Sequence, residues 1–285
     1  MPKISVLMPL YNPEEEHLRA AITSILNQAF TDFELLIVND GSKNNAEEVV
    51  LSFNDERIRY IKHDNMGLAA TLNKGVDLAS TNIIARMDQD DIAHSDRLEK
   101  QFKFLEENPE ISIVGSWIKH FPKTEIVKVP EFPDLMDFLN SCVMNHPTVM
   151  FRKSDFLKYD LKYNSELKTS EDYDLWTRAV RILSFANIQE VLLDYRIHGG
   201  NMTVTRVNLQ HKIECEIKKS LLNHITKNEK IQKDIIKSLN KNYPINMSFK
   251  EKMFSIKNKY SFTKKYKILS ILGISFPLSE KELVK

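Results

Sequence analysis

The sequence has little cysteine and no long apolar run, and each scarcity excludes a class of protein. Only two cysteines, Cys142 and Cys215, occur among 285 residues, so neither a disulfide scaffold nor a cysteine-based zinc site is expected. No stretch approaches the roughly 20 apolar residues that span a bilayer, and the first apolar run, Ile4 to Pro9, is too short for a signal peptide. We therefore expect a cytoplasmic protein, soluble or peripheral to a membrane.

A glycine-rich phosphate loop is also missing. The segment after the first expected strand runs from Pro9 to Pro13 and contains neither glycine nor lysine. A nucleotidyltransferase typically needs a glycine-rich, basic loop at this point, and a dinucleotide-binding oxidoreductase needs Gly-x-Gly-x-x-Gly after a strand. Both classes are disfavoured.

Charge is distributed unevenly along the chain, although the net charge is only +1. Residues 206–285 carry 18 Lys+Arg against 7 Asp+Glu, and the rest of the chain carries 22 against 32. Such asymmetry indicates a negatively charged partner for the basic end, or simply solvated helix faces.

Short apolar runs alternate with helical patterns over the first 120 residues. The stripe of Leu18, Ala21, Ile22, Ile25 and Leu26 has the spacing of an amphipathic helix. The alternation predicts an α/β fold with a mainly parallel sheet covered on both faces. Expected strands are 4–8, 33–38, 57–62, 83–87, 111–118 and 189–197, and expected helices are 14–28, 67–79, 95–107 and 171–183.

Polar residues follow the expected strands, where ligands bind in open α/β sheets. Tyr11 follows the first strand, and its ring could stack on a base. Asp40 follows the second, and its carboxylate could accept a hydrogen bond from the N3–H of uracil. Asn65 comes after the third strand. Taken singly, each is also an ordinary loop residue.

Three carboxylates in four residues follow the fourth strand, at Asp88, Asp90 and Asp91. They repel one another unless a cation neutralises them, and oxygen ligands suit Mg²⁺ or Mn²⁺ shared with substrate phosphates. The alternative is a solvated acidic turn that caps the next helix.

Two further segments carry candidate chemistry. Glu171 and Asp172 follow Ser170, so a carboxylate there could act as a general base, or Ser170 could merely cap an acidic first turn. His198 lies beside paired glycines and could complete a metal site or contact a diphosphate, although a lone histidine is more often structural.

The ordered combination of these motifs over residues 3–201 resembles the inverting glycosyltransferases of family 2, which have the GT-A fold. The resemblance implies a Rossmann-like, mostly parallel mixed sheet flanked by helices. The motifs that carry it are ISVLMPLYN from Ile4, SILNQ from Ser24, FELLIVNDGS from Phe33, NMGL from Asn65 with NKG from Asn73, MDQDD from Met87 and SEDYDLW from Ser170.

Carried onto this chain, the resemblance implies a role for each matching residue. It implies that Asp172 is the catalytic base and that Glu171 positions the acceptor or the base. It implies that Asp90 ligates the metal, with Asp88 at the ribose or the metal's outer shell and His198 as a further ligand. The implied nucleotide-sugar site consists of Pro9, Tyr11, Asp40, Asn65, Gly67, Arg86 and Asp88.

The implied reaction is a single in-line displacement from a UDP-sugar to a hydroxyl of a glycan or lipid-linked acceptor. The segment from Asn145 to Arg152 looks like that of relatives that build lipopolysaccharide or capsule. The sugar, the linkage and the choice between Mg²⁺ and Mn²⁺ stay open. A non-catalytic nucleotide- or sugar-binding module is the remaining alternative, although such a module would be expected to have lost one of the acids.

We expect a catalytic domain at 1–205, with a nucleotide-binding half at 1–120 and an acceptor half at 121–205. Residues 206–285 are expected to form a helical, Lys-rich extension. Between 248 and 274, lysines alternate with aromatic and aliphatic residues, which suits an anionic membrane surface. Packing on the catalytic domain or on a second copy in a homodimer is the alternative. Nucleic acid is disfavoured because Arg206 is the only arginine there.

Overall fold

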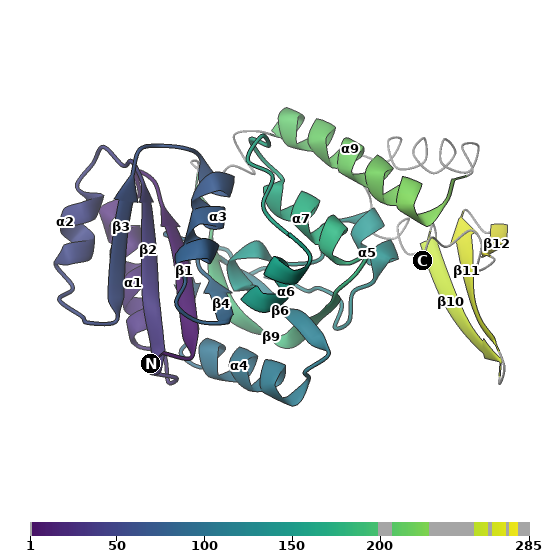
Figure 1. Cartoon of the computed structure of the whole chain (residues 1–285), viewed down its shortest axis with the longest axis horizontal. Helices are drawn as coiled ribbons and strands as arrows, with labels where there is room; N and C mark the ends of the chain where they lie inside the picture. Colours follow the sequence, from purple (N-terminus) through teal and green to yellow (C-terminus); the bar gives the residue numbers. More distant parts are fainter. Residues whose placement is uncertain (1, 199–206, 228–253, 262–263, 272–273, 279–285) are drawn as a thin grey trace. The chain divides into compact units, whose positions relative to one another are not determined.

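The computed structural model of the chain describes residues 2–198, 207–227, 254–261, 264–271 and 274–278. It divides into two compact units, Met1–Ile213 and Glu214–Lys285. The first unit is built on one nine-stranded sheet with helices packed against it (Figure 1).

The first unit alternates strands and helices as predicted. Its first half runs β1 (Ile4–Leu10), α1 (Glu15–Leu26), β2 (Phe33–Asp40), α2 (Ala46–Leu51), β3 (Ile58–His63), α3 (Leu68–Leu78) and β4 (Ile83–Arg86). Its second half runs β5 (Ile92–Ala93), α4 (Arg97–Glu107), β6 (Ile111–Phe121), β7 (Ile126–Val127), α5 (Leu135–Asn140), the 3-10 helix η1 (His146–Thr148), β8 (Met150–Arg152), α6 (Lys153–Lys158), α7 (Glu171–Ala179) and β9 (Ser184–Arg196).

The sheet has the strand order β3-β2-β1-β4-β8-β6-β9-β5, with β7 paired to β6. The four strands β3, β2, β1 and β4 are parallel, as helical crossovers require. Strand β8 pairs antiparallel with both β4 and β6 and so joins this half to the second. The mixed α/β sheet predicted from the sequence is confirmed. The short strand β8 was not predicted because three residues carry too little periodicity.

One face of the parallel half packs against α1. Ile4, Val6 and Met8 alternate along β1 and share a buried cluster with Leu18 and Ile22 of α1. All five side chains are fully buried, and each contributes roughly 1.5–3 kcal/mol through burial. The alternating apolar side chains of the strand and the apolar stripe of the helix therefore pack into the same core.

Helix α3 covers the opposite face. A Cβ built on Gly75 would lie 2.2 Å from Cδ1 of Leu7, so the helix approaches the strand more closely than a side chain at position 75 allows. Leu7 is paired in register with Arg86 of β4, and paired residues on adjacent strands point to the same face. The side chain of Arg86 therefore points toward the α3 side.

The C-terminal unit differs in part from the expected helical extension. The helix α9 (Val207–Ile225) is present, but β10 (Phe254–Ser261), β11 (Lys264–Ile271) and β12 (Ile274–Leu278) form a three-stranded antiparallel sheet. The expectation of helix over these strands was wrong because the apolar residues Phe254, Ile256 and Tyr260 have a period of two. Aromatic and β-branched residues also favour strands. No helix among the described residues is long and apolar enough to cross a bilayer.

We predict that Gly75→Ala destabilises the protein by about 1–3 kcal/mol, because overpacking against Leu7 outweighs the gain of about 1 kcal/mol in helix propensity. Urea unfolding measures the change, with Asp77→Ala on the exposed side of the same helix as the control. The penalty should shrink in a Leu7→Ala background. An unchanged or higher stability of Gly75→Ala would show that α3 can move away from β1.

Candidate active site

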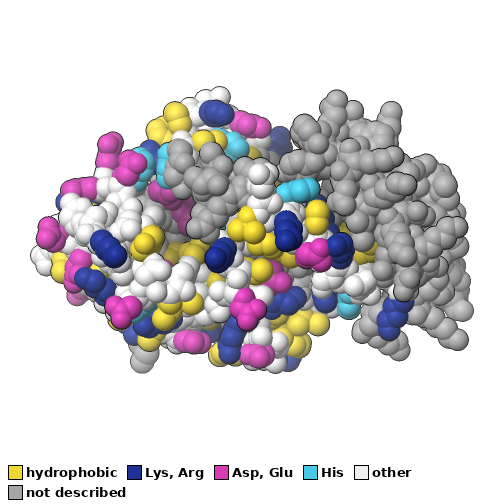
Figure 2. Space-filling model, turned by 90° about the horizontal axis from the view of Figure 1, so that it is seen from above, with side chains coloured by type: hydrophobic (Ala, Val, Ile, Leu, Met, Phe, Trp, Pro, Cys, Tyr) yellow, Lys and Arg dark blue, Asp and Glu magenta, His cyan; other side chains and the backbone are white. Residues whose placement is uncertain are grey.

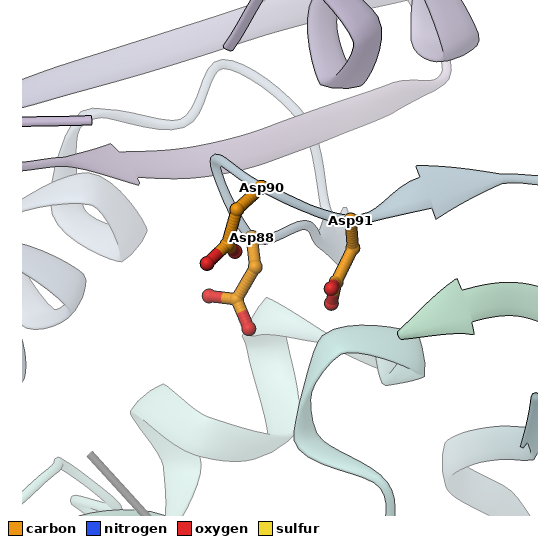
Figure 3. A group of neighbouring side chains, drawn as sticks. All are labelled: Asp88, Asp90 and Asp91. Atoms are coloured by element: carbon orange, nitrogen blue, oxygen red, sulfur yellow. The ribbon is translucent and has the colours of Figure 1, made fainter. Parts of the chain in front are cut away.

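An acidic loop lies between β4 and β5. Carboxylate oxygens of Asp88, Asp90 and Asp91 all lie within 4.8 Å of one another, and Figure 3 shows the three side chains projecting to the same side of the loop. Asp91 is fully buried, and its Oδ2 has no hydrogen-bond partner among the residues that the structure describes. A cluster of hard oxygen atoms at this spacing fits Mg²⁺ or Mn²⁺, so the chemistry of the donor set agrees with the predicted metal site.

Arg86 supplies the buried positive charge beside this loop. Its side chain is only 4% exposed, and both of its terminal nitrogens pair with the carboxylate of Asp88. Burial raises the pKa of Asp88, and repulsion from Asp90 raises it further against the attraction of Arg86. Arg97, itself fully buried, donates to the backbone oxygen of Arg86 at 2.6 Å and so holds the end of β4.

His198 reaches the acidic loop from the end of β9. Its Nε2 lies 2.8 Å from Oδ2 of Asp90, although the two residues are 108 positions apart. The short pairing of β5 with β9, Ile92 with Asp194 and Ala93 with Leu193, brings the two segments together. The structure therefore places the three predicted metal-site residues Asp88, Asp90 and His198 in one group.

Asp40 is held by the loop that precedes α3. Its carboxylate accepts from the Asn65 side chain at 3.0 Å, from Met66 N–H at 2.7 Å and from Gly67 N–H at 3.0 Å. Gly67 has φ of 89°, which favours glycine. A carboxylate offers about four acceptor positions, and these three contacts fill most of them, while His63 Nδ1 lies 3.6 Å from Oδ1 of Asp40. Asn65 and Gly67, predicted to line the donor site, are thus the residues that hold Asp40.

Pro9 and Tyr11 lie on either side of the end of β1. Pro9 is buried and paired with Val38, whereas Tyr11 is 47% exposed. The backbone of Tyr11 is bound by the side chain of Gln89 in the acidic loop, with Tyr11 N–H donating to Oε1 at 2.8 Å and Nε2 donating to Tyr11 O at 3.3 Å. The Tyr11 ring is the more accessible of the two predicted base contacts.

Glu171 and Asp172 begin α7. Glu171 is 5% exposed, and burial together with repulsion from Asp172 raises its pKa to about 7. Asp172 also adds to the raised pKa of Asp88, so the α7 acids and the acidic loop belong to one charged site. Ser170 has φ of 59° and makes no capping bond with its side chain. The alternative interpretation, in which Ser170 caps the helix through its side chain, is therefore wrong.

The parallel strands β1, β2 and β4 end at the same edge of the sheet, and Figure 2 shows histidine side chains beside acidic ones on the surface. Five carboxylates form one group of mutually repelling charges linked through Asp88, and a divalent cation would offset much of their repulsion. The carboxylates are those of Asp88, Asp90, Asp91, Glu171 and Asp172.

Sequence reasoning missed two buried residues of this site, His146 and Tyr163. His146 Nε2 lies 2.9 Å from the Tyr163 hydroxyl, and both residues are buried. Burial lowers the pKa of His146 well below its usual value, and Arg86 lowers it further. His146 belongs to the quoted segment from Asn145 to Arg152, but no pattern in the sequence singles out Tyr163.

Comparison with known proteins agrees with this geometry. The family described as Glycosyl transferase family 2 matches residues 5–167. A glycosyltransferase of Methanocaldococcus jannaschii, described as uncharacterized, is 39% identical over 224 residues, which cover 73% of this chain and 76% of that protein. The Escherichia coli O-antigen biosynthesis glycosyltransferase WbnJ is 33% identical over 214 residues, covering 69% of this chain and 80% of that protein.

Solved structures share the fold. S. aureus TarS 1–349 in complex with UDP-GlcNAc aligns with a TM-score of 0.63 at 18% identity, over 78% of this chain and 72% of that one. The Pyrobaculum calidifontis mannosyltransferase PcManGT, in complex with GDP-Man and Mn²⁺, aligns with a TM-score of 0.58 at 17% identity, over 72% and 60%. The fold is thus GT-A and the class is that of glycosyltransferases. The chain belongs to glycosyl transferase family 2.

We predict that Glu171→Gln stabilises the protein at pH 8 but not at pH 5. Because folding raises the pKa of Glu171 from 4.5 to about 7, its contribution to stability is complete below pH 4.5 and is lost as the pH rises through 7. Glutamine does not ionise and avoids this loss, which amounts to about 3 kcal/mol at most.

Urea unfolding in EDTA at both pH values measures this effect. Glu166→Gln, on an exposed loop residue, is the matched control and should shift stability equally at both pH values. A pH-independent difference for Glu171→Gln would show that the environment of Glu171 does not disfavour its charge.

Proposed function

We propose that the protein transfers a hexose or N-acetylhexosamine from a UDP-sugar to a hydroxyl of a glycan or lipid-linked acceptor, with inversion at the anomeric carbon. The observation that carries the proposal is the cluster of Asp88, Asp90 and Asp91, in which Asp88 interacts electrostatically with Glu171 and Asp172 at the start of α7. The names of similar proteins support the substrate class, since WbnJ is an O-antigen biosynthesis enzyme and TarS structures hold UDP or UDP-GlcNAc. We place the reaction in the synthesis of a cell-surface polysaccharide or lipopolysaccharide.

The nucleoside would be bound at the ends of β1 and β2. Tyr11 offers an exposed ring for stacking on the base. The loop before α3 holds the carboxylate of Asp40 in place through three contacts, and a carboxylate oxygen suits the N3–H of uracil. Asp88, held by Arg86, would then be beside the ribose and the diphosphate of the bound nucleotide.

Asp90, Asp88 and His198 would hold a divalent cation, Mn²⁺ or Mg²⁺, through carboxylate oxygens and an imidazole nitrogen. When bound, the cation supplies Lewis-acid stabilisation of the negative charge on the departing diphosphate. The Mn²⁺ in the PcManGT complex supports this assignment. Nε2 of His198 lies 2.8 Å from Oδ2 of Asp90. When the cation binds, contacts of these two atoms with the ion would partly replace their contact with each other.

Asp172 would act as the general base. It accepts the proton of the acceptor hydroxyl as the oxygen forms a bond to the anomeric carbon. The bond between that carbon and the diphosphate oxygen breaks, and its electron pair leaves with the nucleoside diphosphate. Glu171, with its raised pKa, would orient the acceptor through a hydrogen bond. One displacement from the opposite face inverts the configuration.

The catalytic assignment predicts that Asp172→Asn lowers turnover by roughly 10²–10⁴-fold, because the amide cannot accept the proton. The assay follows nucleoside diphosphate released from a panel of nucleotide sugars by purified protein. Asp174→Asn, two residues along the same helix and paired with Arg178, is the control and should retain activity. Failure to turn over or bind any UDP-sugar would refute the uracil assignment and favour another nucleotide donor or a binding module.

The metal assignment predicts turnover that requires Mn²⁺ or Mg²⁺, stops in EDTA and is lost in Asp90→Asn. Asp96→Asn removes an acid from the next loop that pairs with Lys100, and it should leave metal dependence intact. Full activity in EDTA would refute a metal role for the acidic loop.

The basic end of the chain is proposed to bind an anionic membrane surface, where lipid-linked acceptors are found. Lysines recur along β10 and β11 among aromatic and aliphatic residues, a composition that suits an anionic interface. Flotation with vesicles containing anionic lipid should recover the wild type and lose the triple variant Lys264→Glu, Lys265→Glu, Lys267→Glu. Equal recovery of both would exclude this surface as the membrane contact.

A further inference from the structure

The acidic loop joins three segments of the chain through three consecutive side chains. Asp88 pairs with Arg86 at the end of β4. Gln89 binds the backbone of Tyr11 after β1. Asp90 contacts His198 after β9. The two carboxylates belong to the proposed metal site, whereas the carboxamide between them serves another part of the molecule.

The carboxamide of Gln89 complements the peptide groups of Tyr11 in both directions. Its oxygen accepts from Tyr11 N–H at 2.8 Å, and its nitrogen donates to Tyr11 O at 3.3 Å. An amide carries both a donor and an acceptor, which a carboxylate or a hydrocarbon of the same size lacks. Gln89 therefore holds the backbone of Tyr11 through two hydrogen bonds, one accepted and one donated, and an ionised aspartate could form only the accepted one.

The segment that contains Tyr11 is also tied to the loop after β2. Asn12 N–H donates to Ser42 Oγ at 2.9 Å, and Lys43 N–H donates to Asn12 Oδ1 at 2.8 Å. Tyr11 is nonetheless 47% exposed, so the position of its ring depends on how its backbone is held. Gln89 fixes this backbone from the side of the acidic loop.

We propose that Gln89 is a positioning residue that holds Tyr11 for stacking on the donor's base and so links the base site to the metal-binding loop. The inference rests on the proposed function. It assigns to Gln89 an effect on nucleotide affinity that acts through Tyr11 and not through the metal.

The test is the affinity of the full-length protein for UDP, measured by calorimetry in EDTA. Gln89→Met keeps the size of the side chain but removes both hydrogen bonds, and it should weaken UDP binding roughly five-fold. Gln189→Met is the matched control, because Gln189 also donates to backbone oxygens, those of Val129 and Asn187. It should bind UDP as the wild type does.

Two further measurements separate positioning from general damage. The affinity for Mn²⁺ alone should stay within two-fold of the wild type in Gln89→Met, and KM for the donor should rise with little change in kcat. In a Tyr11→Ala background, Gln89→Met should have no further effect on UDP binding, since residues that act as a unit are not additive.

Unchanged UDP affinity in Gln89→Met, a lowered Mn²⁺ affinity, or full additivity with Tyr11→Ala would each overturn the proposal. These outcomes differ from failure of the proposed function itself. In that case the wild-type protein itself would not bind UDP, and neither would any of the variants.

Discussion

The site depends on the buried ion pair between Arg86 and Asp88. The side chain of Arg86 is buried because of its position in the sheet, where it is paired with Leu7 and lies on the face covered by α3. A buried cation requires an opposite charge, and Asp88 supplies it through both carboxylate oxygens. Breaking such a pair costs roughly 3–5 kcal/mol because the remaining charge stays buried. The pair therefore fixes the start of the acidic loop, on which Gln89, Asp90 and Asp91 depend.

The rest of the site is arranged by bonds between the loops that follow the strands. Asp40 is held by the loop before α3, and Tyr11 is held by Gln89. Apart from Asp40, the last residue of β2, the residues in these contacts lie outside the helices and strands, so the sheet brings the loops near one another and side chains set their final positions. Such preorganisation keeps the ordering cost of ligand binding low.

Much of the fold and part of the site could be predicted from the sequence. The apolar residues of β1 and α1 have clear periods, which predict the strand and the helix. The rule that ligands bind at strand ends correctly predicts that Asp40 and the acidic loop lie at the ends of parallel strands. The C-terminal strands were missed because a lysine-rich segment with few turn residues resembles a solvated helix. Tyr163 and Gln89 were missed for another reason. Their roles come from contacts with His146 and Tyr11 across 17 and 78 positions, and no local pattern records such contacts.

The pairing of β5 with β9 has a consequence for folding. Two residue pairs join Ile92–Ala93, directly after the acidic loop, to the end of β9, directly before His198. So short a ladder contributes little stability alone, and its closure joins segments about 100 residues apart that the pairing of β6 with β9 already brings near one another. Any ligand bound jointly by Asp90 and His198 binds only after closure, so its affinity adds to the stability of the native state. The pairing of β5 with β9 and the formation of a site that includes both Asp90 and His198 are thus coupled, and a chain that lacks the first cannot form the second.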